Sequence, residues 1–184
     1  MKAVFLDRDG TINYEEPNYL LDLKNLKIFE EAFEAIQLLN YHGFKTIVVT
    51  NQSCVGRGLL EERDLQQINS TLKQKLAERK ALLDSIYYCP HHPEAKCLCR
   101  KPKLGMFEQA VKEHKINLKK SFVIGDREFD IHAGKAAGCK TILVLTGAGQ
   151  QTQKTLTRPT DQPDFIADTI LEAVQWIIRQ PLAQ

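Results

Sequence analysis

The chain has 184 residues, of which 43% are hydrophobic and 26% are charged, and its net charge is +2. This balance is ordinary for a globular protein and predicts a single domain over residues 1–184. The scattered Lys and Arg residues argue against a nucleic-acid surface. No apolar run approaches the roughly 20 residues of a membrane helix, and the start of the chain lacks a signal-peptide layout. We therefore expect a cytoplasmic monomer without nucleic-acid or membrane partners, acting on a small molecule.

Short runs of apolar and β-branched residues recur along the chain and predict buried parallel strands. They cover residues 3–6, 46–49, 86–88, 122–124 and 141–145. Apolar residues at helical spacing predict helices over 32–39 and 65–76, and a last helix is expected over 169–179. The segment 147–163 is polar and rich in Gln and Thr, so we expect a surface loop there. This alternation predicts an α/β fold, a doubly wound parallel sheet with helices on both faces.

Polar side chains follow three of the predicted strands, at the edge where such sheets bind ligands. Asp7 and Asp9 follow the first strand, Thr50 and Asn51 follow the second, and Asp126 follows the fourth. One carboxylate of the first pair can attack phosphorus, while the other protonates the leaving oxygen and later deprotonates water. Anions repel a phosphate, so a hard divalent cation is needed. We expect Mg²⁺, with Asp7, Asp9 and Asp126 as its ligands.

A lone Asp after a strand is more often a helix cap than a catalytic group, but agreement between three strand ends reverses that preference. A transferring phosphoryl group also needs donors and cations around its oxygens. Thr50 and Asn51 offer such donors, and Lys101 offers a cation, although an isolated Lys is usually a surface charge. Asp130 is expected to hold a water molecule or to orient its loop.

Cysteine and histidine residues gather in one short loop, residues 89–99. The pattern Cys-x-His-x5-Cys-x-Cys is formed by Cys89, His91, Cys97 and Cys99. Three thiolates and one imidazole make the closed tetrahedral shell of a structural Zn²⁺, and we rank His91 above its neighbour His92 as the imidazole ligand. Chance clustering of buried thiols is the weaker alternative. Reduced thiols are typical of the cytoplasm.

The polar residues at the strand ends resemble the four motifs of the haloacid dehalogenase superfamily of phosphatases. The resemblance runs over nearly the whole chain and is carried by residues 7–11, Thr50, Lys101 and residues 125–126. It implies a Rossmann-like fold, here with a short zinc loop and no large cap domain. It also implies that Asp7 is the nucleophile and Asp9 the general acid and base. Thr50 and Lys101 would then stabilise the phosphoryl group, and Asp126 would bind Mg²⁺.

Within this superfamily, the chain closely resembles the heptose 1,7-bisphosphate 7-phosphatases of lipopolysaccharide precursor synthesis. The resemblance is carried by residues 5–13, 48–53, 57–58, 86–93 and 99–102. It implies an aspartyl-phosphate mechanism acting on the primary 7-phosphate of a small phosphorylated metabolite, D-glycero-D-manno-heptose 1,7-bisphosphate. Contacts to this substrate are expected at Asn13, Tyr19, Asn51, Gln52, Ser53, Arg57, Arg100 and Arg127.

Three other functions fit parts of this sequence. The first is a histidinol-phosphate phosphatase, because the five-residue spacer between His91 and Cys97 also occurs in those enzymes. In addition, Cys54 and Arg127 replace a usual Gly and a common Lys of the heptose enzymes. A nucleic-acid 3'-phosphatase shares the Asp-x-Asp start but would need a basic stripe with stacking aromatic residues. A non-enzymatic zinc-bearing interaction module would not need Asp7, Asp9 and Thr50 together.

Overall fold

The computed structural model describes residues 1–180, in which six parallel strands form one sheet with the order β3-β2-β1-β4-β5-β6. The strands are β1 (Ala3–Leu6), β2 (Lys45–Asn51), β3 (Ser85–Cys89), β4 (Phe122–Gly125), β5 (Lys140–Val144) and β6 (Phe165–Ala167). This is the order of a doubly wound nucleotide-binding sheet. The expected fold class is therefore confirmed. The last four residues of the expected domain, 181–184, lie outside the described residues.

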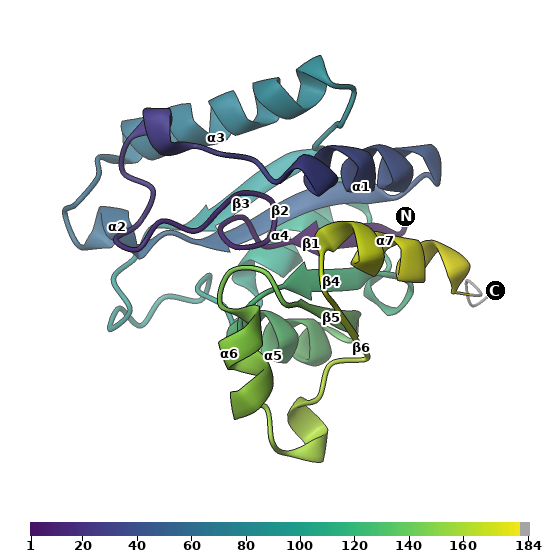
Figure 1. The fold of residues 1–184 in the computed structure, drawn as a ribbon. Coiled ribbons are helices and arrows are strands. Elements are labelled where there is room, and N and C mark those ends of the chain that lie inside the picture. The colour runs from purple at the N-terminus through teal and green to yellow at the C-terminus, as the bar shows by residue number, and fades with distance from the viewer. Residues whose placement is uncertain (181–184) are drawn as a thin grey trace.

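Helices cover both faces of the sheet (Figure 1). The α-helices of the described residues are α1 (Glu30–Tyr41), α2 (Ser53–Gly56), α3 (Glu62–Glu78), α4 (Gly105–His114), α5 (Glu128–Ala137), α6 (Gly149–Thr155) and α7 (Ile170–Arg179). The helices α1, α3 and α7 lie on one side, and α5 and α6 lie on the other. Among residues 1–180, no helix is both long enough and apolar enough to span a bilayer.

Both faces of the central strand are buried, which explains why its sequence is apolar without alternation. Val4 and Leu6 pack in the core under α1, α3 and α7. Ala3 and Phe5 point to the opposite face, where Phe107 of α4 packs on Phe5 with ring centroids 4.7 Å apart. All four β1 residues are completely buried. The first strand is thus held rigidly from two sides.

The C-terminal part of the sheet differs from the sequence-based expectation. Residues 147–163 are not simply a surface loop, because α6 begins at Gly149 and Thr152 is buried. The edge strand β6 was not predicted, since it has only three residues and follows a polar segment. The last helix is confirmed: the Thr169 hydroxyl accepts a hydrogen bond from Glu172 N, 3.3 Å away, and α7 follows directly.

The strand order reverses between β1 and β4, and this is where doubly wound sheets open a crevice for ligands. The backbone N–H of Asp7 donates to the Ile124 carbonyl over 2.9 Å, which ties together the ends of these two strands. Within residues 1–180, no further domain is inserted above this edge. The connecting segments 7–29, 52–61, 90–104, 126–127 and 145–148 surround it.

Candidate active site

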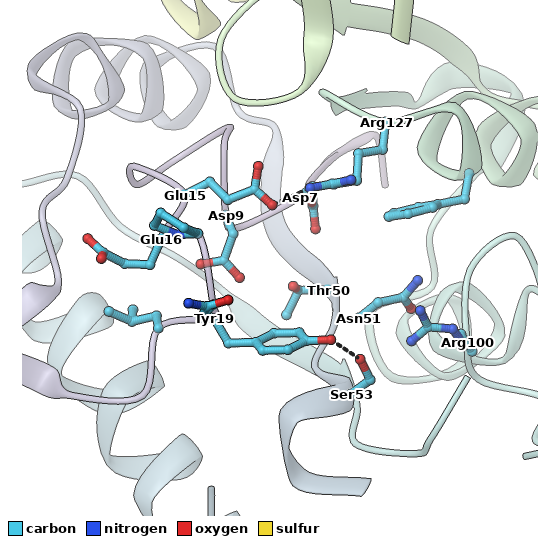
Figure 2. Close-up of a pocket in the computed structure, with 14 residues that line it drawn as sticks. Asp7, Asp9, Glu15, Glu16, Tyr19, Thr50, Asn51, Ser53, Arg100 and Arg127 are labelled. Atoms are coloured by element: carbon cyan, nitrogen blue, oxygen red, sulfur yellow. Dashed lines mark hydrogen bonds and ion pairs between the residues drawn. The ribbon is translucent and has the colours of Figure 1, made fainter. Parts of the chain in front are cut away.

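A cavity of about 330 Å³ opens over the carboxyl ends of β1, β2 and β4 (Figure 2). Acidic residues and Tyr19 line one side of it, and Arg100 and Arg127 lie on the other. The lining residues are Asp7, Asp9, Glu15, Glu16, Pro17, Asn18, Tyr19, Leu20, Thr50, Asn51, Ser53, Arg100, Arg127 and Phe129. The structure therefore brings eight of the sequence-predicted site residues to a single cavity.

Asp7 shares a buried ion-pair cluster with Lys101 and Asp130. Lys101 Nζ lies 2.8 Å from Asp7 Oδ1 and 2.5 Å from Asp130 Oδ1, and it also donates to the Val49 carbonyl over 2.5 Å. Burial acts to lower the Lys101 pKa, but the two carboxylates overcome it and hold the pKa above its ordinary value. Lys101 is thus charged, and its ammonium contacts three protein oxygens.

Asp126 completes a group of three buried carboxylates. One oxygen each from Asp7, Asp126 and Asp130 lies within 4.8 Å of the others. Asp126 Oδ2 accepts from Ala148 N over 2.7 Å, whereas Asp126 Oδ1 is buried and has no partner among the described residues. Burial, followed by the charges of Asp7 and Asp130, raises the pKa of Asp126 to about 8. An unpartnered oxygen amid excess negative charge fits a hard divalent cation such as Mg²⁺.

Asp9 is oriented by hydrogen bonds and does not belong to this group of three. Its carboxylate receives Asn13 Nδ2 at 2.9 Å, Gln52 Nε2 at 2.8 Å and the guanidinium of Arg8 at 2.8 Å. Burial acts to raise the Asp9 pKa, but Arg8 and the side-chain hydrogen bonds outweigh it, so the pKa lies below its ordinary value. Asp9 is therefore a carboxylate that faces the cavity with its side chain 23% exposed.

The segment after β2 connects the remaining groups. Thr50 Oγ1 accepts from Gln52 Nε2 over 2.9 Å, and Gln52 is buried rather than part of the cavity wall. Asn51 clamps the backbone of Lys101: its Oδ1 accepts from Lys101 N at 3.0 Å, and its Nδ2 donates to the Lys101 carbonyl at 3.2 Å. This clamp sets the position from which the lysine side chain enters the core.

The mouth of the cavity carries three polar features. The Tyr19 hydroxyl lies 3.3 Å from Ser53 Oγ (Figure 2). Arg127 forms an ion pair with Glu15. Arg100 lines the cavity, and its Nη1 is buried without a partner in the described part of the chain. In contrast, the predicted contact Arg57 lies exposed at the end of α2, outside the set of lining residues.

The four predicted zinc ligands come together in one cluster. Cys89 Sγ lies 3.7 Å from Cys97 Sγ and 3.5 Å from His91 Nδ1, near the roughly 3.8 and 3.6 Å that a tetrahedral zinc shell requires. Cys99 Sγ is closer, at 3.1 Å from Cys89 Sγ. His92 Nδ1 instead accepts from a backbone N–H, that of Glu94. The donor set fits Zn²⁺.

The cluster is linked to the active site through backbone hydrogen bonds. Gln52 N donates to the Cys89 carbonyl over 2.8 Å, and Gly56 N donates to the Pro90 carbonyl over 2.7 Å. Two residues beyond Cys99, the chain places Lys101 in the core. A metal in this loop would therefore stiffen the backbone on both sides of the cavity.

The family model described as HAD-hydrolase-like matches residues 98–173. A D-glycero-beta-D-manno-heptose-1,7-bisphosphate 7-phosphatase from Pasteurella multocida is 44% identical over 153 residues, which are 79% of this chain and 83% of that protein. The enzyme of the same name from Haemophilus influenzae is 39% identical over 181 residues, 94% of this chain and 92% of that protein. This chain belongs to the heptose-bisphosphate phosphatase family.

A solved structure of the heptose-bisphosphate phosphatase family matches the whole architecture. The D,D-heptose 1,7-bisphosphate phosphatase from B. bronchiseptica, complexed with magnesium and phosphate, has a TM-score of 0.91 and 28% identity. The match covers 98% of this chain and 100% of the other. The resemblance to haloacid dehalogenase phosphatases and to their heptose-bisphosphate branch is thereby confirmed.

Two residues near this site, Arg8 and Asp130, make contacts that the sequence did not predict. Arg8, between Asp7 and Asp9, is completely buried and bound to Asp9. Asp130 pairs with Lys101, which was not predicted, and it also accepts from Arg127 N at 3.1 Å, a contact that orients its loop. The position of Arg8 between Asp7 and Asp9 was the one available signal for its role.

Proposed function

We propose that this chain is a Mg²⁺-dependent phosphatase that removes the 7-phosphate of D-glycero-D-manno-heptose 1,7-bisphosphate and leaves the anomeric phosphate in place. The observation that carries the proposal is the buried Asp7–Lys101 pair at the floor of the cavity, beside the unpartnered oxygen of Asp126. Membership in the heptose-bisphosphate phosphatase family supports the choice of substrate. We further propose that residues 1–184 act as one domain.

In the first step, the Asp7 carboxylate attacks phosphorus, the bond from phosphorus to the ester oxygen breaks, and the departing oxygen takes a proton from Asp9. The product is an aspartyl-phosphate on Asp7. Lys101 contributes its charge and fixes Asp7, because its ammonium already contacts oxygens of Asp7, Asp130 and Val49. The Thr50 hydroxyl can donate to a phosphoryl oxygen. Mg²⁺, when held by Asp7 and Asp126, supplies positive charge to the phosphoryl oxygens.

Asp9 needs a proton before it can act as an acid. Its pKa is below the ordinary value in the free protein, so it begins as a carboxylate. A phosphate dianion placed beside it raises that pKa by charge repulsion. Protonation therefore accompanies substrate binding. In the second step, Asp9 is again a carboxylate and takes a proton from water, which attacks phosphorus and releases Asp7.

The second phosphate of the substrate needs cationic partners at the mouth of the cavity. Among residues 1–180, Arg100 Nη1 is buried and has no hydrogen-bond partner, and Arg127 is available when it leaves Glu15. A guanidinium is suited to bidentate phosphate binding. Asn13 and Gln52, predicted as substrate contacts, hold Asp9 instead, whereas Tyr19 and Ser53 face the cavity. Arg57 stays a predicted contact that would have to move to reach the substrate.

Histidinol phosphate is the second candidate substrate, and one observation favours it. Glu15 and Glu16 line the same cavity, and their carboxylates would suit the ammonium group of an amino alcohol. The two candidates make opposite demands on Arg100, because only a bisphosphate presents a second anion to it. A nucleic-acid 3'-phosphatase and a non-enzymatic zinc module gain no support from this cavity.

We also propose that the Cys89, His91, Cys97 and Cys99 cluster holds a structural Zn²⁺ that supports the backbone around Lys101. The enzyme would act in the cytoplasm, where thiols stay reduced, on a free metabolite and without a nucleic-acid or membrane partner. We expect a monomer, which sedimentation at several protein concentrations would check.

The substrate is tested by kcat/KM for the heptose bisphosphate and for histidinol phosphate, in the parent and in Arg100→Ala. The proposal expects the bisphosphate to be preferred. It also expects Arg100→Ala to lower its kcat/KM by about tenfold to 100-fold, as for loss of one charged hydrogen-bonded pair. Arg63→Ala, a solvent-exposed arginine of α3, is the control. Preference for histidinol phosphate, or an unchanged bisphosphate reaction in Arg100→Ala, would contradict the substrate while leaving the phosphatase chemistry intact.

A further inference from the structure

Arg8 is the largest completely buried side chain among the described residues. A guanidinium in the interior is costly unless every part of it is paired, and a hydrophobic side chain of similar volume would often serve stability as well. Arg8 also sits between the two aspartates of the proposed reaction. Its charge therefore calls for an explanation beyond filling the core.

All three nitrogens of the Arg8 guanidinium are used. Nε and Nη2 donate to Asp9 Oδ1 over 3.2 and 3.1 Å, and Nη2 also lies 2.8 Å from Asp9 Oδ2. Nη2 reaches Gln52 Oε1 over 2.9 Å, and Nη1 reaches Asn69 Oδ1 on α3 over 2.9 Å. Asn69 and Gln52 thus fix the plane of the guanidinium, and the guanidinium fixes the plane of the Asp9 carboxylate.

We propose that Arg8 is the positioning residue for proton transfer by Asp9. Gln52 and Asn69 hold the guanidinium, which grips both oxygens of the carboxylate and aims its cavity-facing edge at the leaving oxygen of the substrate. The planar fork of Arg can do this, whereas the single ammonium of Lys cannot. A proton-transfer group displaced by even 1 Å loses much of its effect. This inference rests on the proposed phosphatase function, in which Asp9 is the acid and base.

The inference predicts a loss that depends on the leaving group. An alkoxide leaving from a sugar phosphate needs a proton from Asp9, whereas p-nitrophenolate leaves without one. We would measure single-turnover ester cleavage with enzyme in excess, in the parent, Arg8→Lys and Arg8→Met. For the best alkyl phosphate, cleavage should slow by about 100-fold, and for p-nitrophenyl phosphate by less than about fivefold. Steady-state release of phosphate should slow for both esters, because Asp9 also activates the water.

Leu72→Ala is the control for lost stability. Leu72 is buried on α3, three residues from Asn69, and does not line the cavity. It should slow cleavage of both esters by similar, small factors at a similar fall in Tm. If the Arg8 variants do not fold, Asn69→Leu takes their place, because it removes one hydrogen-bond partner of the guanidinium. It should also slow cleavage of the alkyl phosphate more than that of p-nitrophenyl phosphate, by a smaller factor than the Arg8 variants.

Equal loss with both esters in folded Arg8 variants, or no loss with either, would overturn the positioning role and leave Arg8 a structural residue. Failure of the proposed function itself looks different. In that case the parent protein would cleave neither ester in the presence of Mg²⁺.

Discussion

Lys101 Nζ lies 2.8 Å from Asp7 Oδ1, although the two residues are 94 positions apart in the sequence. The same ammonium lies 2.5 Å from Asp130 Oδ1, and all three side chains are buried. A single lysine thus compensates two carboxylates in the interior. Removal of either partner of such a cluster leaves an uncompensated charge, so stability and activity should both depend on this contact.

Replacement of Lys101 by Met should be strongly destabilising and nearly inactive. We expect the free energy of unfolding at neutral pH to fall by about 3–5 kcal/mol, as for removal of one partner from a buried ion pair. Activity should fall by about 100-fold or more, because the charge that offsets the phosphoryl oxygens is lost. Urea unfolding and initial rates check both expectations.

Lys45→Met is the matched control for this prediction. Lys45 Nζ lies 2.6 Å from Asp84 Oδ1, but both side chains are partly exposed, at 34% and 23%. Its loss should cost less than about 1 kcal/mol. Equal stability losses in the two variants would contradict the claim that the buried Lys101 cluster stabilises the fold more than a surface ion pair does.

Stability of the metal-free protein should depend on pH through Asp126. Burial is the main cause that raises the pKa of Asp126 to about 8 in the folded protein. In an unfolded chain the pKa of an Asp is about 4. Between these two pH values, Asp126 is therefore protonated in the folded state but not in the unfolded state. The stability from this proton is complete below about pH 4 and is lost as the pH rises through about 8.

Mg²⁺ competes with that proton for the Asp126 carboxylate. Millimolar Mg²⁺ should therefore raise the Tm more near pH 8 than near pH 5. Asp126→Asn should abolish most of the shift at both values. A shift of the same size at both pH values in the parent protein would argue against Asp126 as a ligand.

One Zn²⁺ per chain should survive purification and dialysis. Cys97→Ser should lower the zinc content sharply, since one of four ligands is lost. Activity should also fall, because loss of the zinc loosens the backbone around Lys101. Cys139→Ser is the control, because this buried cysteine lies outside the cluster. Metal analysis of the two variants decides the matter: full zinc content in Cys97→Ser would remove Cys97 from the site.

Sequence reasoning anticipated the features that local pattern determines. Five strands were predicted, because residues such as Val4, Phe5 and Leu6 form apolar runs. The polar groups that follow β1 and β2 do line one cavity, and Asp126 lies beside Asp7. The zinc spacing likewise pointed to four side chains that lie together.

Contacts that depend on tertiary packing escaped prediction. Asp130 meets Lys101 only because α5 begins beside the end of β4, and no spacing in the chain encodes that meeting. Arg8 resembles an exposed cation in sequence, yet Asn69, 61 positions away, gives it a buried partner. The three residues of β6 pair only because β5 presents a free edge.

The most direct test of the central claim is detection of a phosphoryl group on Asp7. Asp9→Asn protein would be mixed with p-nitrophenyl phosphate and Mg²⁺, quenched in acid and analysed by peptide mass spectrometry. Because the variant lacks the base that activates water, we expect the peptide that contains Asp7 to carry one phosphoryl group, only when Mg²⁺ is present. The same peptide from Asp7→Asn should stay unmodified. Phosphate release by the parent protein with the phosphoryl group on another residue, or on none, would contradict the mechanism.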